Sequence, residues 1–200
     1  MRAGFLIELN RVDEAIAELS AAIDGGHPEP DHLCSRVAKI HLLQGHTDEA
    51  VSWYRRAVGW ADERWKRSER GWDALAEGRP FGIPLALAGL STSPAHVSTR
   101  VKLLEALIAA HQLDDARSVA HEIDDLDHAR HDSPLARARI LFVEGKAEEA
   151  ERLADEEAHI VRSPEDVAGW LEDFATLLQR FGPADAAPAV LKVALRIRNQ

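Results

Sequence analysis

Hydrophobic residues recur at helical spacing along most of the chain, in segments followed by a short break and then by acidic residues. Leu103, Leu104 and Leu107 belong to one such segment, and their spacing places them on one face of a helix. The acidic residues after the break, here Asp114 and Asp115, are favourable in the first turn of a second helix because they complement its positive dipole end. The pattern therefore predicts an all-α fold built from helix–turn–helix pairs.

These pairs repeat with a regular period. Five breaks are each followed, at the same place in the pattern, by an alanine: Ala15, Ala50, Ala116, Ala150 and Ala187. The alanines lie 35, 66, 34 and 37 residues apart, and 66 is close to two periods of about 34 residues. We expect each alanine to be a small contact that lets two paired helices approach closely. Prolines cannot continue a helix, so we expect the junctions between units at Pro28, Pro30, Pro94, Pro134 and Pro164.

The segment from residue 31 to residue 62 resembles a repeat of the tetratricopeptide family. Its counterparts of the family's small first-helix residue, turn glycine, second-helix aromatic residue and two alanines are Ala38, Gly45, Tyr54, Ala50 and Ala57. The resemblance implies antiparallel helix pairs stacked into a right-handed α–α superhelical solenoid, with a concave groove lined by the first helices. The family consists chiefly of protein-binding scaffolds. The chain departs from its pattern at Cys34, where a bulky residue is usual, and often lacks the proline that closes a unit.

We expect one tetratricopeptide-like array over residues 1–200, with about five helix pairs and an irregular third pair. Its repeats are predicted at roughly 1–28, 31–62, 63–97, 98–130, 131–164 and 168–200. In the segment 63–97, Trp65 and Trp72 have helical spacing, but Pro80 and Pro84 interrupt it. We interpret this segment as a degenerate repeat with an altered turn. The alternative is a long helix through Glu77, followed by an irregular insertion.

The two ends of the array are expected to be incomplete. If Ala15 is in register, the chain begins inside a first helix. In the last helix, Val190, Leu191 and Ala194 are expected to face the partner helix, which leaves Val193 and Ile197 exposed. Solenoids need polar caps at their ends, so we weigh self-association through the array ends, excision from a longer chain, and harmless exposure of single residues.

The composition limits the classes of partner. The chain has 24 basic and 34 acidic residues and a formal net charge of −10, whereas binding to a phosphate backbone needs a positive field. A single cysteine excludes an internal disulfide and a cysteine-rich zinc module, and no apolar run is long enough for a secretory signal or a membrane span. We therefore expect a cytoplasmic protein without nucleic-acid or membrane partners.

The candidate binding site is the groove that the first helices are expected to line. The residues that the repeat register assigns to it are His32, Ser35, Arg36, Lys39, Lys102, Glu105, Arg139, Phe142, Thr176 and Arg180. Four cations among them, Arg36, Lys39, Lys102 and Arg139, predict a basic strip suited to an acidic or mixed peptide, because recessed cations hold carboxylates well. The alternative is that these side chains are solvated and paired with neighbouring carboxylates.

Three other features suggest chemistry, and each has a structural interpretation that we prefer. Residues 55–70 combine basic side chains with Trp60 and Trp65, as in surfaces that stack bases, but the tryptophans have core-like spacing; a partner contact is also open. Residues 121–132 alternate histidine with carboxylates at spacings that could chelate a metal, yet they span a helix junction where polar residues are expected. Cys34 lies on an apolar face, where an inert thiol is the default.

The sequence therefore predicts a protein–protein interaction module, an adaptor or scaffold that presents a rigid groove to a peptide or protein. We expect no catalytic residue, no bound metal and no cofactor, and hence no enzyme. One alternative is a ligand- or peptide-responsive sensor in signalling or transcription. Another is a non-catalytic appendage of a larger enzyme.

Overall fold

The computed structural model describes residues 6, 11–76, 93–126, 133–160 and 163–199, and these residues form helices without any β-strand. The all-α prediction is confirmed for this part of the chain. The chain forms two compact units, residues 1–100 and residues 101–200, and the division falls inside helix α6 (Ser93–Ala109). The prediction of one array across residues 1–200 stays a prediction.

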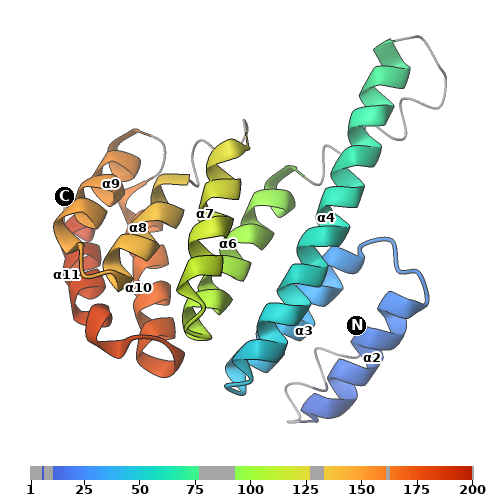
Figure 1. Ribbon diagram of the computed structural model, residues 1–200, viewed down its shortest axis with the longest axis horizontal. Coiled ribbons are helices and arrows are strands. Elements are labelled where there is room, and N and C mark those ends of the chain that lie inside the picture. Colours follow the sequence, from blue (N-terminus) through green and yellow to red (C-terminus); the bar gives the residue numbers. More distant parts are fainter. Residues whose placement is uncertain (1–5, 7–10, 77–92, 127–132, 161–162, 200) are drawn as a thin grey trace. The chain divides into compact units, whose positions relative to one another are not determined.

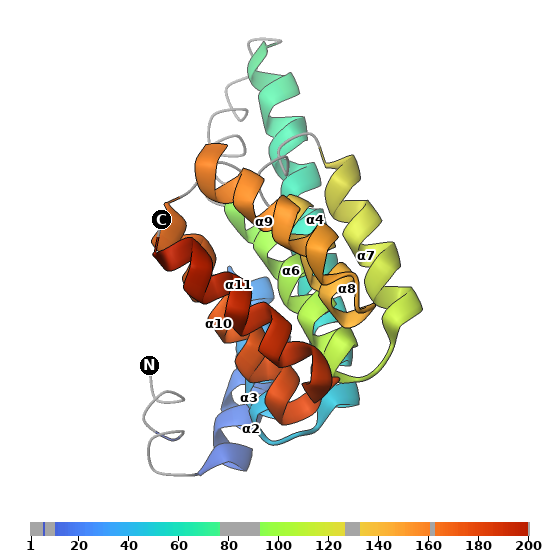
Figure 2. The same ribbon diagram turned by 90° about the vertical axis from the view of Figure 1, so that its left-hand side faces the viewer.

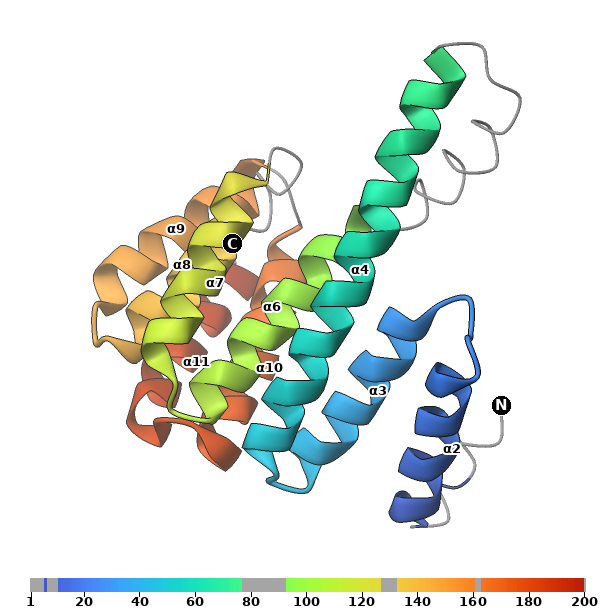
Figure 3. The same ribbon diagram turned by 45° about the vertical axis from the view of Figure 1, so that its right-hand side comes forward.

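In the first unit, α2 (Val12–Asp24) packs against α3 (Pro30–Leu43), and α3 packs against α4 (Thr47–Ala76). Figures 1 and 3 show these three helices side by side. Their core contains Leu19 and Ile23 from α2 and Leu33 and Val37 from α3. The apolar periodicity of each helix thus meets that of its neighbours in one shared core.

Helix α4 is one continuous helix of 30 residues, whereas its partner α3 has 14. At about 1.5 Å per residue, α4 is about twice as long as α3 and extends well beyond it (Figure 3). Our interpretation of residues 63–97 as a separate degenerate repeat is wrong, because residues 63–76 continue α4 without a turn. The alternative, a long helix, is correct as far as Ala76; the insertion proposed after it falls on residues 77–92, outside the described residues.

In the second unit, three further pairs follow one another along the chain. Helix α6 leads by a tight turn into α7 (Leu113–Asp125); α8 (Ser133–Val143) packs against both α7 and α9 (Ala147–Ile160). The helix α10 (Pro164–Phe181), a short 3-10 turn (Ala184–Ala186) and α11 (Ala187–Arg198) complete the unit. Figure 2 shows α10 and α11 side by side. Leu104, Phe142, Phe174 and Leu178 are among its fully buried side chains.

The turns inside three of the pairs have the same hydrogen-bonded geometry. In the turn from α3 to α4, Gly45 N–H donates to Leu42 and His46 N–H donates to His41, at 3.0 and 2.9 Å. The same two bonds, in the same register, close the turns from α6 to α7 and from α8 to α9. This is the Schellman motif, which places a left-handed residue just after a helix; the residues in that position are Gly45, His111 and Gly145, with φ between 58° and 82°.

The features that defined the repeat occupy equivalent places in the structure. All five spaced alanines are completely buried, and each lies in the first or second turn of a second helix; they are Ala15, Ala50, Ala116, Ala150 and Ala187. Acidic pairs occupy the first turns of α2, α4, α7 and α9. Pro30 and Pro164 start α3 and α10, where a proline loses no hydrogen bond. These predictions are confirmed.

In the last helix, Val190 and Ala194 are buried as expected, but the predicted exposure of Val193 and Ile197 is wrong. Val193 and Ile197 are buried rather than exposed, and Leu195, which shares no face with them, is 56% exposed instead. The reason is that α11 packs against α9 as well as against its own partner α10, so its buried face is wider than one partner helix requires. Arg196 holds this arrangement with ion pairs to Glu151 and Asp155 of α9.

No helix in the described part of the chain combines the length and the apolar character that crossing a membrane would require.

Candidate interaction face

Four of the predicted groove residues lie together on α3. His32, Ser35, Arg36 and Lys39 are exposed or half-exposed, and their spacing of three and four residues places them on one side of the helix. Leu43, one turn beyond Lys39, is 50% exposed and continues the same side. We call these five residues the α3 face. The opposite side of α3, with Leu33, Val37 and Ile40, is buried in the core of the first unit.

The only carboxylate of α3 is buried beside this surface, with its Oδ2 3.9 Å from Nε2 of His32. Asp31 is buried, and its Oδ2 accepts a hydrogen bond of 3.1 Å from Nη2 of Arg64 on α4. The other oxygen of Asp31 and Nε of Arg64 are buried without a hydrogen-bond partner among the described residues. Removing one member of such a buried pair leaves the other charge uncompensated. Asp31 therefore links α3 to α4 through this ion pair. The α3 face has no exposed carboxylate from its own helix.

The predicted residues of the second unit are arranged differently. Lys102 donates to Glu105 at 3.0 Å, and Glu105 in turn accepts from Arg139 of α8 at 3.1 Å. The Arg139 guanidinium also donates to the Leu135 carbonyl and lies 5.5 Å from the ring centre of Phe174. The three charged side chains thus form a continuous ion-pair network from α6 to α8. This agrees with the alternative interpretation, in which the cations are paired with neighbouring carboxylates.

Burial corrects the prediction for several of these residues. Arg139 is only 5% exposed, Glu105 7% and Phe142 1%, so none of them presents a side chain to a partner. For Arg139 and Phe142 the cause is the neighbouring helices. Because α8 packs against both α7 and α9, positions of α8 that would face outward in an isolated helix pair are buried. The four-cation strip is therefore not present as predicted.

The remaining predicted residues are exposed. Thr176 of α10 is exposed, and its hydroxyl donates to the Glu172 carbonyl one turn earlier. Arg180 is exposed near the end of the same helix and lies over the Phe181 ring, 4.9 Å from its centre. Lys102 is 55% exposed at its side chain. These residues stay candidates, but the four residues on α3 form the most coherent group.

Cys34 has the environment of an inert thiol. It is completely buried on the core side of α3. Burial raises the pKa of the Cys34 thiol above its usual value of 9.0; the charge of Arg56 lowers it, and those of Asp31 and Asp24 raise it again. A thiol with a raised pKa and no access to solvent is a poor nucleophile, so the preferred interpretation of Cys34 agrees with its burial.

Trp60 is the exposed aromatic residue that the sequence interpretation missed. We assigned it to the core on its spacing, yet it is 37% exposed on α4. The signal was present in the sequence: Ala50, Ala57 and Ala61 define the buried side of α4, and at 100° per residue Trp60 lies about 90° away from the middle of that side. Trp53 and Trp65, by contrast, are half-buried.

The described residues contain no group of three or more histidine, cysteine, aspartate or glutamate side chains placed to hold a metal ion. The histidine-rich segment that raised this hypothesis is only partly covered. His121, Asp124 and Asp125 lie at the end of α7, and Asp124 accepts a hydrogen bond from Ser133. Residues 127–132 fall outside the described residues, so the metal hypothesis for the whole segment is untested.

No protein-family model matches the chain, and a search of curated proteins finds no similar sequence.

Proposed function

We propose that this chain is a tetratricopeptide-like interaction module, and that each unit is built from repeated helix hairpins. The support is the recurrence of one local design: a Schellman turn, an acidic first turn and a buried alanine, at intervals near the family's period of about 34 residues. The 66-residue interval, from Ala50 to Ala116, contains the rest of the long helix α4, residues 77–92 and helix α6. Repeats of this kind use side chains on rigid helices for binding.

We further propose that the α3 face binds an acidic segment of a protein partner. The observation that carries this proposal is the burial of Asp31, the only carboxylate of α3, in an ion pair with Arg64. Arg36, which is half-exposed, and Lys39, which is exposed, give this side of α3 two positive charges. Leu43 adds an apolar contact at one end. The complementary partner carries carboxylates spaced along one side and an apolar residue after them.

The mechanism is binding by a surface that is already in place. The α3 backbone is fixed by its contacts with α2 and α4, so only side chains lose freedom when a partner binds. Charge complementarity at an exposed face contributes mainly to the association rate and to the choice of partner. We therefore expect binding that weakens as salt concentration rises, since exposed charges are screened.

The test is a comparison of the unmodified chain with the double variant Arg36→Glu, Lys39→Glu. The probes are acidic peptides with one apolar residue, selected on the unmodified chain by peptide display. We expect the double variant to bind the selected peptides at least about tenfold more weakly, because each reversal turns attraction into repulsion. Binding is measured by fluorescence anisotropy at low salt.

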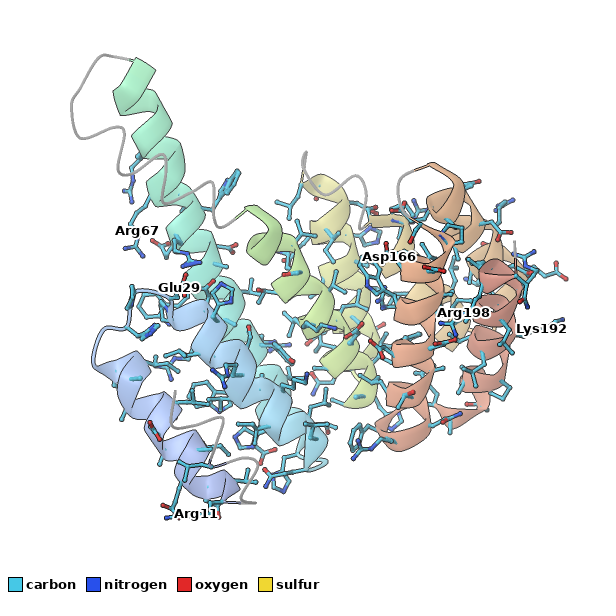
Figure 4. All side chains as sticks on the ribbon, turned by 180° about the vertical axis from the view of Figure 1, so that it is seen from behind. Arg11, Glu29, Arg67, Asp166, Lys192 and Arg198 are labelled. Atoms are coloured by element: carbon cyan, nitrogen blue, oxygen red, sulfur yellow. The ribbon has the colours of Figure 1, made fainter. Side chains whose placement is uncertain are left out.

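A charge-matched control separates the α3 face from net charge. The double variant Arg152→Glu, Lys192→Glu changes the formal charge equally at exposed positions on α9 and α11 and is expected to bind like the unmodified chain. Lys192 stands at the outer side of α11 in Figure 4. Equal affinity of all three proteins for the peptides, or failure to select any acidic peptide, would contradict the proposed site. Thermal unfolding confirms that each variant is folded.

A further inference from the structure

The outer side of α4 carries a basic stripe that the α3 face does not include. Its cations are Arg55, Arg56, Lys66, Arg67 and Arg70, all exposed. They follow the helix from residue 55 to residue 70, which is about 22 Å at the usual rise. Arg67 projects from this side of α4 in Figure 4.

Trp60 lies within the stripe and gives it an apolar centre. Its side chain is 37% exposed, between Arg56 and the later cations. Gly59 beside it carries no side chain, and the space that a Cβ would occupy there is open. Part of the positive charge is used within the unit: Arg56 pairs with Asp24 of α2 at 3.3 Å, and Lys66 pairs with Glu63 at 3.3 Å. An exposed tryptophan surrounded by arginines has the composition of a protein interface centre.

The opposite charge is concentrated in the second half of the same chain. Residues 1–100 contain 12 basic and 14 acidic side chains, whereas residues 101–200 contain 12 basic and 20 acidic ones. Much of this excess lies on the outer sides of α7 and α9. Exposed carboxylates occur there at helical spacing, at Asp115, Glu122 and Asp125 on α7 and at Glu148, Glu149 and Glu156 on α9, where they surround one exposed cation, Arg152.

We propose that the chain associates with a second copy of itself, through the α4 stripe of one copy and the acidic outer sides of α7 and α9 of the other. Charge complementarity favours this occupant over a nucleic acid, because the chain's overall charge of −10 repels a phosphate backbone. The same overall charge also makes two copies repel each other. This repulsion is overcome only when the positive stripe of one copy is aligned with the negative face of the other. The association is therefore specific in orientation.

The two surfaces are different, so the contact is heterologous. A head-to-tail contact leaves one stripe and one acidic face free at the ends of a pair, and further copies can add unless the rotation closes a ring. We therefore expect oligomers whose size grows with protein concentration, rather than a dimer that saturates.

Salt gives the first test, by sedimentation velocity of the full chain over a range of concentrations. Exposed charges interact over about 30 Å at about 0.01 M salt but over about 3 Å at about 1 M. We expect concentration-dependent oligomers at the lower salt and monomers at the higher salt. Monomers at every concentration in low salt would overturn the proposal.

Charge exchange gives the decisive test. The variants Arg67→Glu, Arg70→Glu on α4 and Glu122→Lys, Glu149→Lys on α7 and α9 are each expected to weaken association by about tenfold or more. When the two variants are mixed, the reversed stripe of one meets the reversed face of the other, and association is expected to return. All four positions are exposed, so the fold should be retained, which circular dichroism verifies. Loss of association without recovery on mixing would contradict pairing of these two surfaces.

Two further variants separate this contact from its alternatives. Trp60→Ala is expected to weaken association by roughly tenfold to thirtyfold, the usual loss for a tryptophan at an interface centre. Lys39→Glu on the α3 face and Asp173→Lys on α10 are charge controls and should leave association unchanged. Lys39 belongs to the proposed peptide site, so Lys39→Glu should weaken peptide binding without changing association. Failure of one proposal can therefore be distinguished from failure of the other. Association that responds equally to every charge change would indicate nonspecific attraction and overturn the proposal.

Discussion

Four turns in the described part of the chain place a residue in the left-handed region at the same position, namely Gly26, Gly45, His111 and Gly145, and only His111 is not glycine. Gly45 and Gly145 have φ of 82° and 77°, whereas His111 has φ of 58°. A side chain in this conformation brings Cβ close to the carbonyl oxygen and costs roughly 1–2 kcal/mol, a cost that glycine avoids. The turn from α6 to α7 therefore keeps its geometry at the expense of local strain.

We predict that His111→Gly stabilises the protein by about 1 kcal/mol, because the strain is removed and the hydrogen bonds of the turn are kept. The measurement is the free energy of unfolding in urea. Gly145→Ala is the matched control and should destabilise by a similar amount, since it introduces the strain that His111 now has. A loss of stability in both variants would show that the His111 side chain contributes a contact of its own.

At the end of α3, His41 lies in an environment that lowers its pKa. Burial lowers the pKa of His41 below its usual 6.5; the Glu49 carboxylate raises it and a charged His46 lowers it. Its Nδ1 is buried without a hydrogen-bond partner among the described residues, and the two imidazole rings lie 6.0 Å apart. The folded protein thus favours neutral His41, whereas the unfolded chain takes up a proton near the usual pKa.

The sign of the pH effect follows from this difference. The contribution of His41 is fully present above pH 6.5 and is lost as pH falls from 6.5 towards the lower folded pKa, because only the unfolded chain gains the proton in that window. We predict that His41→Gln gives a smaller fall in unfolding free energy between about pH 7.5 and pH 5.5. The change His121→Gln at an exposed position on α7 controls for the loss of a histidine. Identical pH profiles of the unmodified chain and His41→Gln would refute this account.

At the scale of the elements, α4 is where local pattern and structure differ most. Residues 63–76 could begin a new first helix on their tryptophan spacing, but they continue the helix that starts at Thr47. Contacts with other elements support the continuity at this point: Arg64 pairs with Asp31 of α3, and Arg100 of α6 makes two bonds of 2.9 Å to Asp62. Helix propensity alone does not distinguish a long helix from two short ones, because no glycine or proline stands between Ala61 and Arg70.

A proline substitution tests this continuity. We predict that Glu63→Pro destabilises the protein by about 3 kcal/mol or more, because a proline inside a helix loses one hydrogen bond and clashes with the preceding turn. At the start of a separate helix, the same proline would be tolerated. Thr47→Pro, at the first position of α4, is the control and should change the unfolding free energy by no more than about 0.5 kcal/mol. Equal, small effects of both prolines would argue for a helix boundary near residue 63.

At the scale of the whole molecule, the chain forms two compact units, residues 1–100 and 101–200. Each has its own buried core, with Ile23 and Val37 in the first and Phe174 and Leu178 in the second. The charge is also distributed unevenly, because residues 101–200 hold most of the acidic excess. The units can therefore be perturbed individually.

We predict that Leu178→Ala lowers the stability of the second unit by about 2–5 kcal/mol, the usual cost of removing a fully buried leucine. Hydrogen exchange should show faster exchange of the amides in α8–α11, and little change in α2 and α3, if the two units open separately. Val37→Ala is the matched change in the first unit and should give the reverse pattern. Uniform acceleration over both units in either variant would mean that they unfold together.

The sequence by itself determined the features that depend on near neighbours along the chain. The helices, the acidic first turns, the prolines at helix starts and the buried alanines follow from periods and capping rules that act within a few residues. Only the tertiary structure decided which side chains are accessible. Arg139 and Phe142 became core because α8 is covered by two helices, Val193 and Ile197 were buried because α11 contacts α9 as well as α10, and Trp60 was left at the surface. Burial is a property of the neighbours that folding brings together, and a period of 3.6 residues gives the side of a helix without giving the number of helices that cover it.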